Sequence, residues 1–361
     1  MDKTKFQLMK GNEALAESAI RAGMKAYFGY PITPQSEILE YLSRHGAKNN
    51  VVVLQAESEI ASINMVFGAA GAGARVMISS SSPGISLMQE GISYLAAANL
   101  PCVIVNVQRG GPGLGTIQPS QADYFQATKG GGHGDYHLIV LAPNSVQEMV
   151  DFVFDAFRLS EKYRVPAMIL TDGALGQMME KIVLPEFGTL PHDTPSWATT
   201  GKLKNRERNI ITTLFIEPER MEVINLNLQK KYLEIQKETR IELINCDDAE
   251  IILVAYGLSS RISSRAMELA QEEGIKVGLA RPITLYPFPK NEILNLSKNE
   301  NVKFLVVEMN AGQMLEDVKL SVAKNSPVDF YGRMGGMIPS PEEVLAEIKS
   351  IYQHKIEVVN Q

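Results

Sequence analysis

The sequence predicts an α/β protein with a doubly wound parallel sheet in residues 1–187, followed by a second α/β domain in residues 246–361. In both parts, short runs rich in valine and isoleucine alternate with stretches of helical periodicity, as is typical of parallel sheets buried on both faces. The alternation weakens over residues 188–245, where we expect a linker or docking segment. A chain of 361 residues is long enough for two domains, each with its own core.

The first domain is expected to begin with a helix at residues 12–27, with Asn12 as its N-cap. The next strands are expected at residues 50–55, 74–80, 101–108, 137–143 and 166–172, and helices at 59–72, 85–99 and 145–163. Ligands of such sheets bind beyond the carboxyl ends of the strands. The informative loops are therefore those that follow Tyr30, Gln55, Ile78 and Gln108.

The second domain repeats the pattern, with strands expected within 249–257, 275–289, 302–312 and 328–336. Before it, residues 218–240 contain an apolar stripe at helical spacing, formed by Ile224, Leu228, Tyr232 and Ile235. This stripe is typical of an ordinary surface helix, which we favour over a docking arm.

Composition excludes several classes of protein. The formal charge of -6 argues against nucleic acid or an anionic membrane as the main partner. No run approaches 18 apolar residues, and the N-terminus lacks the pattern of a signal peptide, so we expect a cytoplasmic protein. Cys102 and Cys246 form no CxxC pair and are expected to be buried apolar residues. Because an iron–sulfur cluster needs about four thiolates, this chain cannot hold one alone.

Two acidic side chains stand where the strand at 50–55 passes into the helix at 59–72. A carboxylate near a helix start interacts favourably with the helix dipole and the free N–H groups, which explains Glu57. Glu59 is followed by Ile-Ala-Ser-Ile-Asn-Met, a poorly solvated surrounding that disfavours the charged form of a carboxyl group. Residue types alone leave Glu59 either as a functional acid or as a second helix-start carboxylate.

Polar groups gather at the ends of the next two strands. The run "SSSSPG" at 79–84 could hold a polar ligand through hydroxyls and backbone amides, or could simply form a turn. Arg109 precedes "GGPGLG", so its guanidinium could grip a carboxylate or phosphate, or remain a solvated loop charge. The glycine spacing does not match a dinucleotide fingerprint. His133, in "GGGHGD", is a candidate acid or base or a structural loop histidine.

Five motifs, in order, resemble those of the α subunits of 2-oxoacid:ferredoxin oxidoreductases. They are "YPITPQSE" at 30–37, "ESEIASINMVFGAAGAGARVMISSSSPG" at 57–84, "QRGGPGLGTIQPSQAD" at 108–123, "GGHGD" at 131–135 and "ARPITLYPFP" at 280–289. The resemblance covers nearly the whole chain and is weakest over 188–245. It is closest to the branched-chain type, whose usual substrate is 3-methyl-2-oxobutanoate.

The resemblance implies a thiamine diphosphate enzyme divided among chains, which oxidatively decarboxylates a 2-oxoacid with coenzyme A to acyl-CoA and CO₂. This chain would contribute a pyrimidine-binding domain and a domain like the C-terminal one of transketolase. A β subunit would hold Mg²⁺, the diphosphate and a [4Fe-4S] cluster, and γ and ferredoxin-like δ subunits would complete the assembly. Ferredoxin would accept the electrons. In agreement, Asp172-Gly173 lacks the preceding glycine and downstream asparagine of the segment that holds magnesium and diphosphate.

Residue roles follow from the same resemblance. Glu59 matches the catalytic glutamate that bonds to N1′ of the aminopyrimidine, and Arg109 matches the arginine expected to bind the substrate carboxylate. Thr33 matches the threonine beside cofactor and substrate, which the flanking prolines would present in a restricted backbone.

The remaining assignments are weaker. Pro31, Ile32 and Ser82 are expected to contact the cofactor, and Gly111 and His133 are further candidates. No metal ligand is expected in this chain.

The substrate is inferred from a missing cation. The α subunits of 2-oxoglutarate enzymes commonly have a lysine-containing "PTKTEQ" segment after the glycine loop, whereas the matching "GTIQPSQAD" here has no cation. An unpaired carboxylate in a buried pocket is costly, so a branched-chain 2-oxoacid is expected. A 2-oxoglutarate or pyruvate enzyme is the alternative. A non-catalytic assembly subunit is the alternative of another class, against which an intact Glu59 argues.

Overall fold

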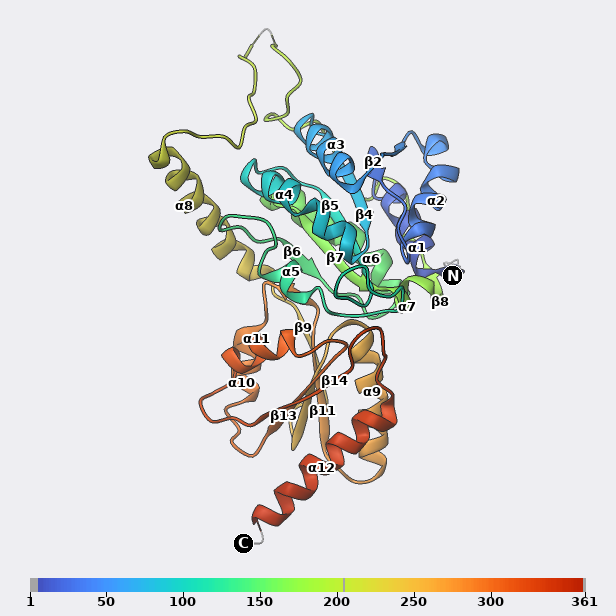
Figure 1. Ribbon diagram of the computed structural model, residues 1–361, viewed down its shortest axis with the longest axis vertical. Coiled ribbons are helices and arrows are strands. Elements are labelled where there is room, and N and C mark those ends of the chain that lie inside the picture. The colour runs from blue at the N-terminus through green and yellow to red at the C-terminus, as the bar shows by residue number, and fades with distance from the viewer. Residues whose placement is uncertain (1–5, 204, 360–361) are drawn as a thin grey trace.

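The computed structural model describes residues 6–203 and 205–359. Its first domain is built around a seven-stranded sheet (Figure 1). The strand order is β12-β6-β7-β5-β4-β2-β3, and all neighbours are parallel except β12, which is antiparallel to β6. The strands are β2 (Ala26–Gly29), β3 (Val52–Gln55), β4 (Val76–Ser80), β5 (Val103–Gln108), β6 (Ile139–Leu141), β7 (Ala167–Asp172) and β12 (Thr284–Tyr286).

Helices cover both faces of this sheet, because successive side chains of a strand point to opposite faces. In β4, Met77 packs with α1 (Gly11–Arg21), α2 (Ser36–His45) and α6 (Val146–Tyr163). Its neighbours Val76 and Ile78 pack with α3 (Glu59–Gly71) and α4 (Ser82–Ala97) on the other face. The sheet is therefore doubly wound, as the sequence predicts.

A second α/β domain lies below the first in Figure 1. Its sheet has the order β14-β13-β10-β11-β9, parallel except for β9. The strands are β9 (Ile241–Ile244), β10 (Ile251–Val254), β11 (Val277–Pro282), β13 (Lys303–Glu308) and β14 (Val328–Gly332). The helices are α9 (Gly257–Glu272), α10 (Lys290–Leu296), α11 (Gln313–Ser321) and α12 (Pro341–Val359). One apolar core runs from α3 and α4 into this domain, so the two domains pack as one body.

The connection between the domains contains α8 (Pro218–Ile235), which lies along the side of the first domain (Figure 1). Leu228, Tyr232 and Ile235 are buried, which confirms the predicted apolar stripe of a surface helix. Strand β9 also lies within the segment expected as a linker and joins the second sheet. The smaller elements are β1 (Phe6–Lys10), β8 (Met179–Val183), α5 (Tyr124–Thr128), α7 (Gly173–Gln177), η1 (Ala47–Asn49) and η2 (Gln236–Glu238). Among the described residues, no helix is both long and apolar enough to cross a membrane.

One local prediction is wrong. Helix α1 begins at Gly11 and its N-cap position is Lys10, so Asn12 is not the cap. The Asn12 amide instead donates to Pro34 O at 2.8 Å and to a Glu37 carboxylate oxygen at 2.9 Å. Asn12 thus connects α1 to the segment that follows β2, a contact between residues 22 positions apart.

Candidate active site

The predicted site residues lie where the parallel strands of the first sheet end. Thr33 follows β2, Glu59 begins α3 after β3, Ser82 begins α4 after β4, and Arg109 follows β5. Because these strands are neighbours and parallel, their carboxyl ends meet at one edge of the sheet. This edge faces the second domain, and Met309 O accepts a hydrogen bond from Ser120 Oγ at 3.2 Å across the junction.

The Tyr30–Pro34 loop is held by a chain of hydrogen bonds that leads through the side chains of Gln35, Ser79 and Tyr27. Gln35 Nε2 donates to Tyr30 O at 3.1 Å, and its Oε1 accepts from Ser79 Oγ at 2.6 Å. Ser79 in turn bonds to Tyr27 OH at 2.6 Å, and burial raises the pKa of that phenol. The Thr33–Pro34 peptide is cis, and a Cβ on Gly173 would lie 2.9 Å from the Pro34 ring. Backbone restriction by proline, as predicted, is therefore joined by a set of distant polar contacts.

Thr33 itself is exposed, and its hydroxyl makes no hydrogen bond within residues 6–203 and 205–359. Pro31 is exposed and Ile32 half-buried in the same loop. The loop thus presents a free hydroxyl on a backbone that is held firmly.

Arg109 is 8 % exposed and bonds to two loops. Its Nη1 donates to Thr33 O at 3.0 Å, and its Nη2 donates to Leu114 O at 2.8 Å in the glycine loop. Its Nε is buried and has no partner among the described residues. A guanidinium has five N–H donors, so these two bonds leave donors for a ligand. Arg109 therefore fastens the Thr33 loop to the glycine loop and keeps unused hydrogen-bonding capacity.

Ser82 makes hydrogen bonds within the protein through both its hydroxyl group and its backbone N–H. Its Oγ donates to Asp123 at 2.6 Å and accepts from Arg109 N at 3.0 Å, and its backbone N–H donates to Asn106 at 3.1 Å. Asn106 also donates to Asp123 at 2.8 Å. Burial raises the pKa of Asp123, and these donors partly offset that effect. Ser82 thus positions the Arg109 backbone, a contact that its place in the "SSSSPG" run does not indicate.

Glu59 is 6 % exposed and is the first residue of α3. No described residue makes a hydrogen bond or ion pair with its carboxyl group. The carboxyl group packs against Gly84 of α4. A Cβ on Gly84 would lie 2.6 Å from Glu59 Oε1 and 2.0 Å from Ser80 Oγ, so a larger residue there would force one of these side chains to move. Ser80 and Ser81 are buried, and their hydroxyls also lack partners. The structure therefore places a buried carboxyl group and the unpaired hydroxyl of Ser80 beside one glycine.

A cleft of about 410 Å³ separates the two domains beside this cluster. Ser82, Gly111 and Asp123 line it from the first domain, and Met309, Asn310 and Met334 from the second. Glu59 does not line the cleft; it contacts α4 at Gly84, next to Pro83, which does.

Gln121 holds the two domains together at the base of the cleft. Its Nε2 donates to Tyr256 O at 2.8 Å, and its Oε1 accepts from Ser259 Oγ at 2.7 Å and from Met309 N at 3.1 Å. Asn310 Nδ2 donates to Gln121 O at 2.8 Å. All these groups are buried, so the cleft has a well-defined shape.

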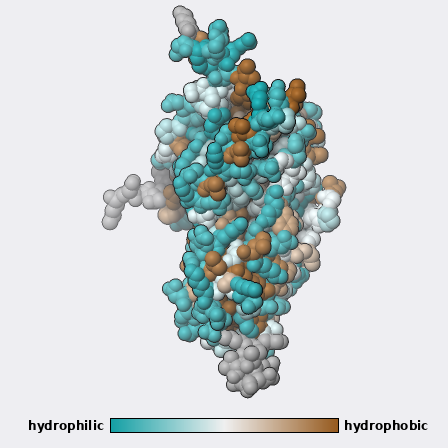
Figure 2. Space-filling view, turned by 90° about the vertical axis from the view of Figure 1, so that its left-hand side faces the viewer, coloured by the Kyte–Doolittle hydropathy of each residue, from teal (hydrophilic) through white to brown (hydrophobic). Residues whose placement is uncertain are grey.

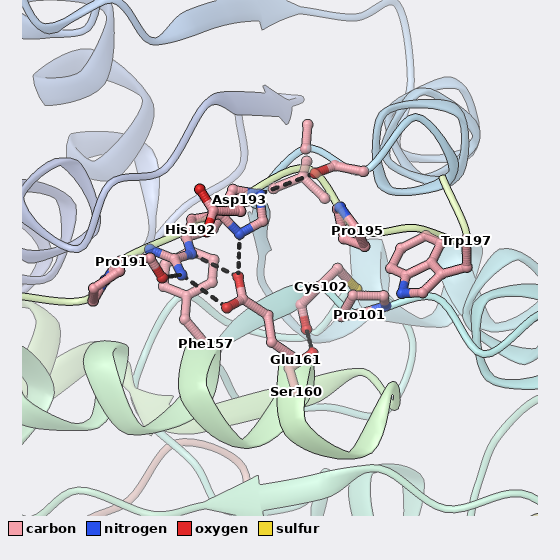
Figure 3. A pocket seen from close by; sticks show the side chains of 14 residues that line it. Pro101, Cys102, Phe157, Ser160, Glu161, Pro191, His192, Asp193, Pro195 and Trp197 are labelled. Atoms are coloured by element: carbon pink, nitrogen blue, oxygen red, sulfur yellow. Dashed lines mark hydrogen bonds and ion pairs between the residues drawn. The ribbon is translucent and has the colours of Figure 1, made fainter. Parts of the chain in front are cut away.

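Two further features lie away from the cleft. His133 is exposed and lines a separate cavity with Tyr94 and Met221. A cavity of about 200 Å³, shown in Figure 3, lies at the amino end of β4. There Arg75 bonds twice to Glu161, at 2.6 and 2.8 Å, and His192 contacts the same carboxylate at 3.2 Å. This cluster fastens the connector near residue 192 to the opposite end of the sheet from Glu59.

Two domain families match the chain. The thiamine diphosphate-binding domain of pyruvate flavodoxin/ferredoxin oxidoreductases matches residues 17–245, and core domain II of pyruvate:ferredoxin oxidoreductase matches residues 249–344. The chain belongs to the 2-oxoacid:ferredoxin oxidoreductase family. The resemblance found in the five motifs is thereby confirmed, as is the expected pairing of a thiamine diphosphate-binding domain with a second α/β domain.

Two relatives within the oxidoreductase family are similar over nearly their full length. Ketoisovalerate oxidoreductase subunit VorB of Methanothermobacter marburgensis is 50% identical, with 96% of this chain and 97% of that protein covered. 2-Oxoglutarate synthase subunit KorA of Methanocaldococcus jannaschii is 37% identical, with 94% and 98% covered.

Solved structures share the architecture. A 2-oxoglutarate:ferredoxin oxidoreductase of Magnetococcus marinus, with 2-oxoglutarate, coenzyme A and succinyl-CoA bound, superimposes with a TM-score of 0.84 at 28% identity. The match covers 97% of this chain but 66% of that longer chain. A split gene transketolase, described as an inactive beta4 tetramer, has a TM-score of 0.57 at 12% identity and shares the fold.

The residues present fit the aminopyrimidine end of thiamine diphosphate. The Glu59 carboxyl group, which has no partner, and the orphan hydroxyl of Ser80 pack against Gly84, and the orphan hydroxyl of Ser81 follows at the same strand end. Nothing comparable is found for the metal: the described residues contain no group of three or more His, Cys, Asp or Glu side chains that could hold one. Burial raises the pKa of both cysteine thiols, that of Cys246 to about 11.

Sequence reasoning missed several residues of this site. Asn12, Gln35, Asp123 and Gln121 hold its loops, and Ser80 rather than Ser82 has the unused hydroxyl. The only signal for Ser80 is the run of four serines, which does not distinguish its members.

Proposed function

We propose that this chain is the α subunit of an oxidoreductase that converts a branched-chain 2-oxoacid, 3-methyl-2-oxobutanoate, and coenzyme A to acyl-CoA and CO₂. A β subunit would hold Mg²⁺, the diphosphate of the shared cofactor and a [4Fe-4S] cluster. A γ subunit and a ferredoxin-like δ subunit would complete the complex, and ferredoxin would accept the electrons. The observation that carries the proposal is the buried, unpartnered carboxyl group of Glu59 in a chain that is 50% identical to ketoisovalerate oxidoreductase subunits.

The lining of the cleft supports a substrate without a second carboxylate. Its apolar contributors include Pro83, Met309 and Met334. Arg109 is the one cation among the described lining residues, and two of its nitrogens hold backbone carbonyls. 3-Methyl-2-oxobutanoate has one carboxylate, which the remaining donors of Arg109 could bind, whereas the distal carboxylate of 2-oxoglutarate would stay unpaired at a cost of several kcal/mol.

Each residue has a defined task in this proposal. Glu59, the first residue of α3, would bind the aminopyrimidine through its carboxyl group and act there as an acid–base group. Thr33 would present its free hydroxyl to the substrate. Pro31, Ile32 and Ser82 would shape the surrounding wall, and Gly111 would admit substrate without a side chain. Thiamine diphosphate, when bound, supplies the electron sink that decarboxylation of a 2-oxoacid requires.

The test is an anaerobic assay of the complex co-purified with its partner subunits. With coenzyme A and a redox dye, turnover should be fastest with 3-methyl-2-oxobutanoate in a panel that includes 2-oxoglutarate and pyruvate. Glu59→Gln should abolish turnover while the subunits still assemble. Glu57→Gln is the matched control, because Glu57 is exposed just before the same helix and should leave the rate unchanged. Faster turnover of 2-oxoglutarate than of 3-methyl-2-oxobutanoate would refute the proposed substrate. An active Glu59→Gln complex would refute the catalytic role of Glu59.

A further inference from the structure

The hydroxyl of Ser80 has no hydrogen-bond partner among the described residues, although Ser80 is 1 % exposed. Burying an unpaired hydroxyl destabilises a protein by an amount similar to a lost hydrogen bond. Such a group is rarely retained without a purpose, because replacement by alanine would remove the penalty. Ser80 is the last residue of β4, at the sheet edge that carries the predicted site.

The position of Ser80 is defined by Gly84. The point where a Gly84 Cβ would stand is 2.0 Å from Ser80 Oγ and 2.6 Å from Glu59 Oε1. The two oxygens therefore both pack against the Gly84 backbone, where a Cβ would otherwise stand. Gly84 lies in a helix with ordinary backbone angles. A glycine is therefore needed there for the close approach of Ser80 and Glu59, and not for its backbone conformation.

The neighbouring serines have different surroundings. Ser79 points to the other face of β4 and bonds to Tyr27 and Gln35. Ser82 bonds to Asp123 and to the Arg109 backbone. Ser81 is also unpaired, but the three atoms nearest to the position of a Gly84 Cβ come from Ser80 and Glu59. Ser80 is thus the member of the run whose free donor lies beside the carboxyl group.

We propose that Ser80 is a positioning residue for Glu59: its hydroxyl donates to the Glu59 carboxylate when the cofactor site is filled, and orients that carboxylate toward the ring. This inference rests on the proposed function. Rotation about the Cβ–Oγ bond redirects the hydrogen of a serine hydroxyl, and a hydrogen bond to a charged acceptor is stronger than one between neutral groups.

The proposal predicts opposite effects of Ser80→Ala on stability and on activity. Without cofactor, the variant should unfold at the same temperature as the wild type or higher, because it loses an unpaired buried hydroxyl. In the complete complex, kcat/KM for the 2-oxoacid should fall about 10- to 100-fold, as expected for one hydrogen bond to a charged group. Affinity for thiamine diphosphate, measured by titration calorimetry, should fall by a similar factor.

A graded series of variants separates positioning from packing. Ser80→Cys, which keeps the size of the side chain but donates weakly, should lie between alanine and wild type. Ser263→Ala is the matched control, because Ser263 of α9 is equally buried and unpaired but belongs to the second domain.

Two results would overturn the inference. One is a Ser80→Ala complex with wild-type turnover and cofactor affinity. The other is a loss of stability in Ser80→Ala that the Ser263→Ala control does not show, because this would mark a structural role. Failure of the proposed function is recognised separately: if the wild-type complex oxidises no 2-oxoacid, the calorimetric comparison with thiamine diphosphate still decides the role of Ser80.

Discussion

The guanidinium of Arg109 donates a hydrogen bond of 3.0 Å to the backbone carbonyl of Thr33. The two residues are 76 positions apart and come from loops after β5 and β2. A second bond from the same side chain reaches Leu114 O at 2.8 Å. One side chain therefore sets the distance between the exposed threonine hydroxyl and the glycine loop, and a ligand bound there would find both already in place.

This relationship predicts that Arg109→Lys is not conservative. A lysine cannot hold both carbonyls in the geometry of a guanidinium, so at least one of the two carbonyls loses its charged donor. We expect the free energy of unfolding to fall by about 2 kcal/mol and turnover to fall about 100-fold. Urea denaturation and the dye assay measure these effects. Arg158→Lys, in an exposed pair with Asp155, should change stability by less than about 0.5 kcal/mol; an equal loss in both variants would contradict the prediction.

Gly84→Ala should block the site without unfolding the protein. The new methyl group would overlap Ser80 Oγ and Glu59 Oε1, and one of them would have to move. We expect cofactor-dependent turnover to fall at least about 100-fold. Alanine favours helix over glycine by about 1 kcal/mol, which partly offsets the strain in stability.

Gly68→Ala in α3 is the control for this substitution. A Cβ at Gly68 meets nothing within 4 Å, so this change should leave the chain as stable or more so. Thermal unfolding of both variants makes the comparison. Normal turnover in Gly84→Ala would show that the arrangement of Glu59 and Ser80 beside Gly84 is not needed for the reaction.

Stability should fall as pH rises through the range in which Glu308 titrates. This carboxyl group is fully buried and caps α11 through Met314 N at 2.9 Å and Leu315 N at 3.0 Å. Burial nevertheless raises its pKa from 4.5 to about 7, beyond what these donors offset. Between these two values the folded state retains a proton that the unfolded state has lost, so folding becomes less favourable as pH rises, by at most about 3 kcal/mol.

Glu308→Gln isolates this effect, because an amide does not titrate. The difference in unfolding free energy between wild type and Glu308→Gln should change across this window and level off above about pH 7. Denaturant titrations at a series of pH values measure it. The comparison removes the contribution of Asp172, whose pKa burial also raises, to about 6. A constant difference would contradict the prediction.

Gln121→Ala should loosen the contact between the domains. It would leave Tyr256 O, Ser259 Oγ and Met309 N without their partner in a buried interface. We expect the free energy of unfolding to fall by about 3 kcal/mol. Limited proteolysis should then cut between residues 188 and 245 more rapidly. Gln126→Ala, which loses one exposed bond to Ser86, is the control and should have a much smaller effect.

The sequence by itself determined the layered α/β fold, because apolar runs buried on two faces permit few other arrangements. It also determined the family, through five motifs in order, and the sheet edge at which Thr33, Glu59, Ser82 and Arg109 lie. These properties depend on local pattern and on the rule that parallel strands end together.

Only the tertiary structure decided what each polar group contacts. Asn12 has the spacing of a helix cap but bonds to Pro34, and Ser82 is satisfied by Asp123 while Ser80 is left free beside Glu59. Asn12 and Pro34 are 22 positions apart, and Ser82 and Asp123 are 41 positions apart. Arg75 and Glu161, which also form a pair, are 86 positions apart. A side chain's type predicts its capacity for hydrogen bonds, but its partner depends on which distant element packs against it.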